Sequence, residues 1–313
     1  MERLQICDFK EGQKVQTSLL ITQLTKGVTT SGAPYASFNL SDKSGTIEAK
    51  LWDVKEDQLE GVDGGKVVSI SAEVLKYRNA LQLRLYSIQK MDPADYKAED
   101  YVRSSHLSQI QMKTKLDEIL SSMKDVVYHD ICSAIILEFE DRLYSAPAAA
   151  KNHHEFAGGL PTHMIAMCDL ADVICKLYPQ LNRDLLIGGV LLHDMGKTIE
   201  LSGPIMTEYT LEGKLIGHIS IMESKVAEIS KSLGYGQSEQ ALLLRHLILS
   251  HHGQYEYGSP VLPMVMEAEL LNFIDNIDAR MNMFDKALAG INQGEWTQRI
   301  FSLENRAFYK PKQ

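Results

Sequence analysis

Residues 191–197 read LLHDMGK, and they close a run of apolar residues that begins at Leu185. Only two adjacent glycines interrupt this run before His193 and Asp194 follow as neighbours. A helix that is apolar on all sides is buried in a protein core, where an ionisable side chain needs a partner. The stretch therefore predicts a buried helix, and it raises the question of what receives the His–Asp pair at its end.

Helical periodicity extends from about residue 105 almost to the end of the chain. Apolar residues recur at i, i+3 and i+4, which predicts amphipathic helices. The expected helices span residues 109–123, 125–144, 162–178, 181–197, 217–234, 238–253 and 265–288. The last residues, 289–313, are expected to form a short helix and a basic tail.

The first ninety residues have the period of strands instead. A polar segment, residues 54–65, separates the third and fourth stretches of β-formers, and this order predicts a small Greek-key barrel of the OB type. The phrase FNLSDKSGTIEAKLW, residues 38–52, resembles the second and third strands of nucleic-acid-binding OB domains. Strands are expected at residues 15–25, 35–42, 44–53, 66–77 and 81–91.

Composition sets the outer limits of function. The chain has 313 residues, 44% of them hydrophobic, which fits two domains better than one. The net charge of −9 excludes a protein that binds polyanions over its whole surface, so nucleic-acid binding would need local patches or metal ions. No apolar window of membrane-spanning length and no signal peptide are apparent, and a cytoplasmic location is expected. The four cysteines form no CxxC motif that would indicate a structural zinc site.

Histidines gather in the helical half. Of ten in the chain, eight lie between residues 153 and 252. Imidazole and carboxylate ligands suit Mn, Fe, Zn or Ni, and the facing helices of a bundle commonly gather such ligands. One histidine on an apolar face is usually a core residue, but here each of five expected helices contributes a His or Asp. Their order is His163, His193-Asp194, His218, His251-His252 and Asp275.

This ordered set resembles the HD-domain metal-dependent phosphohydrolases over roughly residues 150–285. The resemblance implies two divalent ions that share a hydroxide for in-line attack on phosphorus, with Asp194 bridging them. One ion would be held by His163, His193, Asp194 and Asp275, and the other by Asp194, His218 and the pair His251 and His252, of which one or both bind. Manganese is the favoured metal, with iron, cobalt, nickel or magnesium as alternatives.

Three further residues are candidates for contact with substrate phosphate. Lys197 follows Asp194 by one helical turn and would neutralise phosphate charge beside it, unless it is an exposed lysine at a helix end. His153 and His154 resemble the family's entry loop, with structural capping as the alternative. His246 lies off the face of His251 and is expected in the core or behind the ligands.

The expected barrel supplies candidates for binding a single strand, since OB domains combine aromatic platforms with scattered basic residues. Phe38 and Trp52 are expected in the barrel core rather than on its surface. The better candidates flank turns or lie on the strands: Tyr35, Tyr77, Arg78 and Arg84, with Tyr86 as a further aromatic.

An OB domain followed by an HD domain resembles the YhaM-type 3′–5′ exoribonucleases from end to end, including the closing LENRAFYKP. The fold class is then multidomain α and β, a five-stranded OB-type β-barrel followed by an all-α HD-domain helical bundle. The resemblance implies metal-dependent release of nucleoside 5′-monophosphates from the 3′ ends of single-stranded RNA, with some activity on single-stranded DNA. The domains are expected at residues 1–92 (OB), 93–148 (linker and leading helices), 149–288 (HD) and 289–313 (C-terminal helix and basic tail).

Two other functions stay open at this point. The HD site could hydrolyse a small nucleotide or cyclic nucleotide, with the barrel serving in assembly, for instance of a homo-oligomer. The chain could instead be a non-catalytic RNA-binding protein in which the site only stabilises the fold, although a complete ligand set argues against this.

Overall fold

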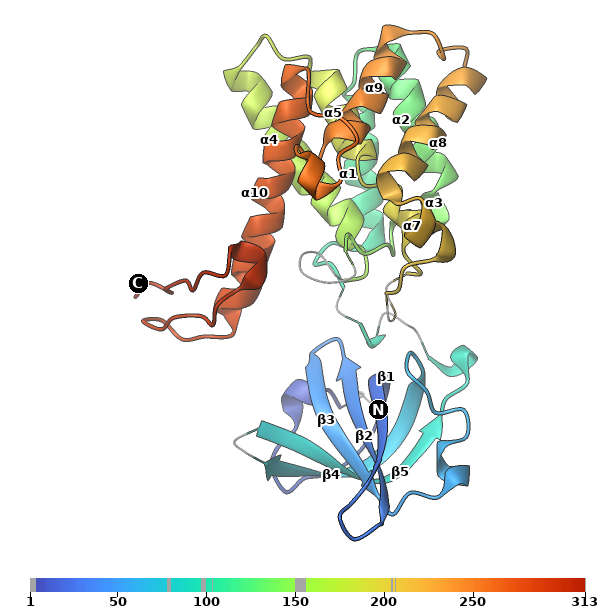
Figure 1. The fold of residues 1–313 in the computed structure, drawn as a ribbon, viewed down its shortest axis with the longest axis vertical. Helices are drawn as coiled ribbons and strands as arrows, with labels where there is room; N and C mark the ends of the chain where they lie inside the picture. The colour runs from blue at the N-terminus through green and yellow to red at the C-terminus, as the bar shows by residue number, and fades with distance from the viewer. Residues whose placement is uncertain are drawn as a thin grey trace. The chain divides into compact units, whose positions relative to one another are not determined.

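The computed structural model describes residues 4–77, 80–96, 100–102, 104–149, 156–203, 205 and 207–312, without the side chains of residues 56 and 57. The chain divides into two compact units, Met1–Ser104 and Ser105–Gln313 (Figure 1). The first unit is a β-barrel and the second is a helical bundle, as the sequence predicts.

The first unit is a closed five-stranded barrel with the order β1-β2-β3-β5-β4. The pairing of β3 with β5 is parallel and the other pairings are antiparallel. The polar segment between β3 and β4 contains a short 3-10 turn, η2, at Glu56–Leu59. The strands are β1 (Lys14–Val28), β2 (Pro34–Asp42), β3 (Gly45–Trp52), β4 (Val67–Tyr77) and β5 (Ala80–Lys90).

Alternate residues of each strand fill the barrel, as the period of two requires. Phe38 on β2 is 1% exposed and lies in the core as expected, but Trp52 at the end of β3 is 45% exposed, so its expected core position was wrong. The β2–β3 turn is organised by the buried Asp42, whose Oδ1 accepts hydrogen bonds from Ser44 N at 2.7 Å and Gly45 N at 3.2 Å. The phrase LSDKSG therefore encodes a turn that sets the register of β2 against β3.

The second unit is a bundle whose helices begin at side-chain caps in several places. The side chains of Ser108, Asp125, Asn182 and Ser238 accept hydrogen bonds from backbone N–H groups in the first turn of their helices. The helices are α1 (Gln109–Ser121), α2 (Val126–Glu138), α3 (Glu140–Leu143), α4 (Gly159–Leu177), α5 (Arg183–Leu192), α6 (Lys197–Glu200), α7 (Leu211–Leu215), α8 (His218–Ser232), α9 (Glu239–Ser250) and α10 (Met266–Ala289).

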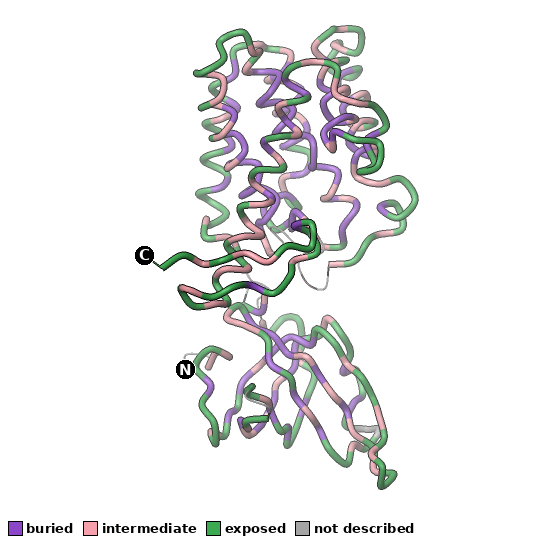
Figure 2. The backbone as a smooth tube through the Cα atoms, turned by 60° about the vertical axis from the view of Figure 1, so that its left-hand side comes forward, coloured by how far each residue is buried: buried purple, intermediate pink, exposed green. Residues whose placement is uncertain are grey.

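Helix α5 forms the centre of the bundle, in contact with α2, α4, α9 and α10. Every residue from Asp184 to Leu192 is buried, and Figure 2 shows the buried backbone gathered inside the bundle. A Cβ on Gly189 would lie 2.4 Å from Leu247 Cδ2, so glycine lets α5 approach α9 this closely. Because α5 is buried on all sides, whatever follows it in the chain is delivered to the interior.

Two stretches differ from the expected domain plan. Helices α1 to α3 share one hydrophobic core with α4, α5, α8, α9 and α10, so residues 109–143 belong to the bundle itself. Where a C-terminal helix is expected, the chain forms a hairpin-like segment with the bridges Trp296↔Tyr309 and Ile300↔Arg306 around a 3-10 turn, η6 (Phe301–Leu303). We call residues 292–312 the C-terminal hairpin. Among the described residues, no helix combines the length and apolar character that a membrane span requires.

Candidate metal centre

The predicted ligands come from five helices and meet at helix ends or inside the bundle. His163 lies on the second turn of α4, and His193 caps α5 with Asp194 following it. His218 is the first residue of α8 and His251 caps α9. His252 follows His251, and Asp275 lies on α10. Buried helix ends can present polar side chains inward without breaking the apolar packing of the helices themselves.

Asp194 lies in the middle of this group and is 3% exposed. Its Oδ1 is 3.5 Å from His218 Nε2 and 3.8 Å from His251 Nε2. Its Oδ2 is 3.4 Å from His193 Nε2 and 2.6 Å from Lys197 Nζ. One carboxylate thus faces both subsets of histidines, which is the arrangement that a bridging ligand needs.

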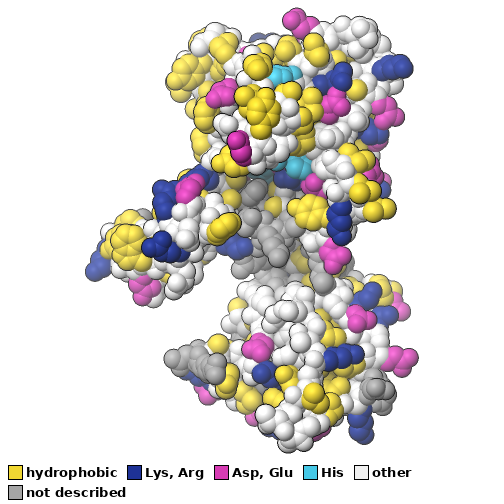
Figure 3. All heavy atoms as spheres, viewed as in Figure 1, with side chains coloured by type: hydrophobic (Ala, Val, Ile, Leu, Met, Phe, Trp, Pro, Cys, Tyr) yellow, Lys and Arg dark blue, Asp and Glu magenta, His cyan; other side chains and the backbone are white. Residues whose placement is uncertain are grey.

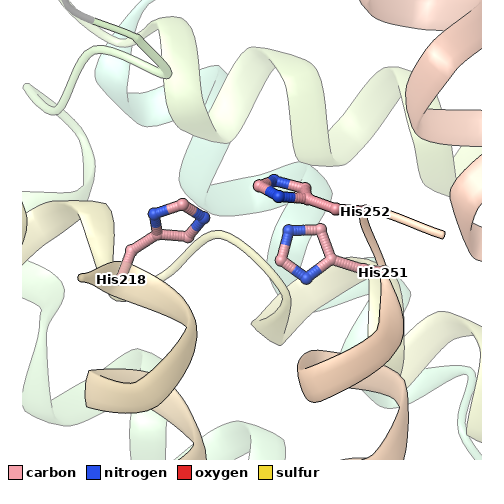
Figure 4. A group of neighbouring side chains, drawn as sticks. All are labelled: His218, His251 and His252. Carbon is pink, nitrogen blue, oxygen red and sulfur yellow. The ribbon is translucent and has the colours of Figure 1, made fainter. Parts of the chain in front are cut away.

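The histidines fall into two neighbouring groups. His163, His193 and Asp194 each offer a ligand atom within 4.8 Å of the others, and so do His218, His251 and His252. Figure 4 shows the second group, in which His218 from α8 and the two histidines at the end of α9 turn their rings toward one another. Asp275 adjoins the first group, with its Oδ1 3.2 Å from His163 Nε2.

Three of the imidazoles are oriented by backbone carbonyls. In each case Nδ1 lies at hydrogen-bond distance from a carbonyl oxygen, so Nδ1–H donates and the lone pair of Nε2 faces the site. This tautomer leaves the ring ready to bind a metal ion. The three bonds are His193 to Val190 O at 2.8 Å, His251 to Ile248 O at 2.7 Å and His252 to Tyr257 O at 2.7 Å.

The other two imidazoles are oriented by carboxylates that sequence reasoning missed. Asp278 Oδ2 lies 2.6 Å from His163 Nδ1, and Glu200 Oε1 lies 3.1 Å from His218 Nδ1. Glu200 also accepts a hydrogen bond from the backbone N–H of His218 at 3.1 Å. A signal for Asp278 existed, because it follows Asp275 by three residues and so lies near the same face of α10. Nothing in the spacing of Glu200 pointed to its role.

The donor set passes a test of whether it fits metal ions. Within the described part of the chain, four buried polar atoms of this group have no hydrogen-bond partner: His193 Nε2, Asp194 Oδ1, His218 Nε2 and His251 Nε2. Buried polar atoms are almost always satisfied, so their convergence on one point indicates a site for a cation. Imidazole nitrogens mixed with carboxylate oxygens match divalent transition metals.

The electrostatics of the group favour the same interpretation. Burial alone would raise the pKa of Asp194, but the ammonium group of Lys197 holds it well below its usual range, so it is ionised. Burial lowers the pKa values of His251 and His252, which keeps both rings neutral. Burial also opposes the protonation of His163, but its hydrogen bonds to carboxylates raise its pKa to about 9. A divalent ion bound beside His163 would replace the proton that the neighbouring carboxylates favour on this ring.

Lys197 is the first residue of α6, and its side chain is 12% exposed. It reaches Asp194 rather than solvent, so the alternative of an exposed lysine at a helix end was wrong. A cavity of about 400 Å³ lies beside it, lined also by Arg142, Ser145, Ser202 and Thr210.

Other predicted residues are not gathered at this centre. His246 Nε2 accepts a hydrogen bond from Met264 N at 3.0 Å, which is a structural role behind the ligands. His153 and His154 lie outside the described residues, as does Arg78 of the barrel.

On the barrel, the outward face of β2 and β3 carries an aromatic pair. The rings of Tyr35 and Trp52 lie 5.4 Å apart at 37°, and Lys50 Nζ lies 5.8 Å from the centre of the Trp52 ring. Arg84 on β5 is exposed and is paired in register with Lys50. Tyr77, at the end of β4, is 54% exposed. A cavity of about 340 Å³ adjoins Tyr35, lined by residues that include Lys26, Gly27 and Leu59.

Comparison with known proteins agrees with both halves of the fold. A model of the OB-fold nucleic acid binding domain matches residues 20–91, and a model of the HD domain matches residues 161–280. Two relatives, from Geobacillus sp. (strain WCH70) and Bacillus pumilus (strain SAFR-032), are each 43% identical over 98% of this chain. The match covers 94% and 98% of the two relatives, and both are called 3′–5′ exoribonuclease YhaM.

Two solved structures of a replication protein A domain from Methanococcus maripaludis also match. Each is 17% identical with a TM-score of 0.25 and covers 28% of this chain and 94% of its own.

Proposed function

The chain belongs to the YhaM family of 3′–5′ exoribonucleases, and on this premise we propose that it shortens single-stranded RNA from the 3′ end as a divalent-metal-dependent phosphodiesterase. The observation that carries the proposal is the convergence of buried, partnerless histidine nitrogens on Asp194. Single-stranded DNA shares the phosphodiester and a flexible backbone, and we propose it as a second substrate.

Two ions fit the ligand set best. His163, His193, Asp194 and Asp275 would hold one ion, and the other would be held by Asp194 with the second group of histidines. When bound, such ions supply a water molecule of lowered pKa and offset the charge of the phosphoryl oxygens. Manganese suits the mixture of imidazole and carboxylate donors.

The chain's own residues prepare this centre. Glu200 and Asp278 fix the rings of His218 and His163, so that little reorganisation is needed when substrate arrives. Lys197 holds Asp194 in position, and its ammonium group adds a positive charge for the scissile phosphate. The cavity beside Lys197 supplies room of the size of one nucleotide.

The barrel would hold the strand. Tyr35 and Trp52 offer faces on which bases stack, and Lys50 and Arg84 lie beside them to contact phosphates. This face is the outer side of the strands with which OB folds bind oligonucleotides. The aromatic contacts are independent of base identity, so binding without sequence preference is expected.

A time course of RNA degradation tests the proposal. Two 5′-labelled single-stranded RNAs, one with a free 3′ hydroxyl and one with a blocked 3′ end, are incubated with Mn²⁺ and then with a chelator. A descending ladder on the free 3′ end alone, absent with chelator and with Asp194→Ala, is the expected result. Intact RNA in every lane would overturn the proposal in favour of a small nucleotide substrate.

A further inference from the structure

The C-terminal hairpin carries three exposed aromatic rings. Phe301 is 92% exposed, Trp296 65% and Tyr309 41%. Figure 3 shows hydrophobic and basic side chains together on the lobe that this segment forms beyond α10. Trp296 and Tyr309 adjoin each other, with ring centroids 5.4 Å apart, and contiguous exposed apolar groups often mark a binding site.

The hairpin is anchored to α10, which holds in place the backbone that carries its exposed rings. The ring of Phe308 packs edge-on against Phe284 of α10, with the centroids 4.6 Å apart. Lys310 Nζ donates hydrogen bonds to Leu288 O in the last turn of α10, at 2.8 Å, and to Ile291 O just beyond the helix, at 2.9 Å. Arg280 on α10 forms a bidentate ion pair with Glu304 of the hairpin. A surface fixed in this way loses little conformational entropy on binding.

The two faces of the hairpin are different. Thr297 is buried and Phe308 is half-buried, both on the face toward α10. Their neighbours Trp296 and Tyr309 form a cross-strand pair on the opposite face, with ring centroids 5.4 Å apart. Successive side chains of a strand point to opposite faces, so one face of the hairpin is buried and the other is exposed to solvent.

Cations accompany these rings. Arg299 and Lys312 are exposed, and neither has a carboxylate within 4.0 Å among the described residues. Among the described residues, Arg299 Nη1 donates a hydrogen bond to the backbone oxygen of Asn305, at 3.3 Å. The chain as a whole has a net charge of −9, so these cations form a local exception. Together with the exposed aromatic rings, they are complementary to a polyanion whose bases can stack.

We propose that the C-terminal hairpin is a second RNA-binding surface, separate from the barrel and part of the same compact unit as the metal centre. Bases stack on Trp296, Tyr309 and Phe301, while Arg299 and Lys312 contact phosphates. The inference rests on the proposed function, because it takes RNA to be the substrate that binds this unit. RNA bound to this surface would remain associated with the catalytic unit between successive cleavages.

The test measures the affinity of the full chain, carrying Asp194→Asn so that RNA stays intact, for a fluorescein-labelled 20-nucleotide oligo(U) by fluorescence anisotropy. Adding Phe301→Ala should weaken binding by about fivefold or more, since each stacked base contributes on that scale. The ring of Phe301 is almost fully exposed, so its loss should leave the fold unchanged. Adding Arg299→Gln and Lys312→Gln together should make the slope of log affinity against log salt less steep by about 1.4, because two phosphate contacts are lost.

Tyr178→Ala is the matched control. This ring is 53% exposed at the end of α4 and is not part of the proposed RNA-binding surface. Equal RNA affinity for Phe301→Ala and the control would overturn the inference. A change in the molecular mass of Phe301→Ala in solution, with unchanged RNA affinity, would also overturn it and would assign the hairpin to self-association. Because binding is measured without hydrolysis, failure of the proposed nuclease activity in the degradation time course is a separate result.

Discussion

Lys197 Nζ lies 2.6 Å from Asp194 Oδ2, and the two residues are three positions apart across the turn that joins α5 to α6. Burial opposes the charge on Lys197, but the Asp194 carboxylate raises the pKa of its ammonium group. The carboxylate at the centre of the site is therefore paired with a cation of the chain on one oxygen. Its other oxygen faces His218 and His251.

Lys197→Met should lower kcat by about two orders of magnitude, because a positive charge directed at the phosphoryl oxygens is lost. The affinity for Mn²⁺ should be unchanged or higher, because a cation competing for Asp194 is removed. Hydrolysis of RNA at saturating Mn²⁺ and calorimetric titration of the metal measure the two quantities. Lys176→Met, an exposed lysine on α4, is the control, and a large loss of metal affinity in Lys197→Met would contradict this role.

Glu200→Gln should weaken metal binding by about 10- to 100-fold, the usual cost of removing a carboxylate behind a ligating histidine. The substitution keeps the size of the side chain but removes the charge that orients His218 through its Nδ1. Titration with Mn²⁺ measures the effect. Glu228→Gln changes a carboxylate on the exposed side of α8 and should bind Mn²⁺ like the unmodified protein. Unchanged affinity in Glu200→Gln would show that the backbone alone positions His218.

Gly196→Ala should destabilise the protein by about 1–3 kcal/mol, the range for overpacking a buried site. A Cβ on Gly196 would lie 2.2 Å from the carbonyl oxygen of His218, so the start of α8 would have to shift. Thermal unfolding without metal measures the loss. Gly290→Ala is the control, because there the nearest atom is 3.9 Å away. An unfolding temperature equal to that of the control would mean that α8 moves at no cost.

Trp52→Ala should weaken the binding of a long single-stranded RNA by about tenfold, since one stacking platform is lost. The KM for a dinucleotide should change much less, because a dinucleotide that occupies the metal centre leaves no strand for the barrel. Steady-state kinetics on both substrates measure the difference. Val28→Ala removes another exposed apolar side chain from the barrel and serves as the control. Equal changes in KM on both substrates would assign Trp52 a structural role.

His246→Gln should reduce the loss of stability on acidification. Burial lowers the pKa of His246 below its ordinary value of 6.5, and its Nε2 accepts a hydrogen bond only when the ring is neutral. The unfolded chain binds this proton more tightly, so the contribution is complete above about pH 6.5 and is lost as the pH falls through the lower pKa of the folded state. Glutamine keeps an acceptor and does not titrate.

The unfolding temperature of the protein, measured without metal at several pH values, should therefore fall more steeply below about pH 6.5 than that of His246→Gln. Parallel curves for the two proteins would show that His246 does not contribute to the pH dependence.

Much of the architecture follows from local patterns. The strands of the barrel and most helices lie within a few residues of the ranges that periodicity predicts, because one face of each element is apolar and must be buried. The predicted helix at residues 181–197 is the informative exception. It ends at Leu192 and resumes at Lys197. A continuous helix would separate adjacent side chains by about 100°. The turn instead leaves His193 Nε2 3.4 Å from Asp194 Oδ2.

The positions of single side chains were harder to predict. Trp52 has the size and apolar character of a core residue, but it follows the inward-facing Leu51 on β3 and so points outward. The C-terminal segment has helical spacing over a few residues only. Its conformation is decided by contacts with α10, in particular that of Phe308 with Phe284.

The sequence by itself determined the two-part fold and singled out His163, His193, Asp194 and His218 as candidate ligands, since the identity and order of such residues are local facts. Only the tertiary structure decided that one oxygen of Asp194 faces both His218 and His251. It also decided that Glu200 and Asp278 hold the rings from behind. Those relationships depend on how α5, α8, α9 and α10 pack, and the packing angles of helices are set by the whole core rather than by any one segment.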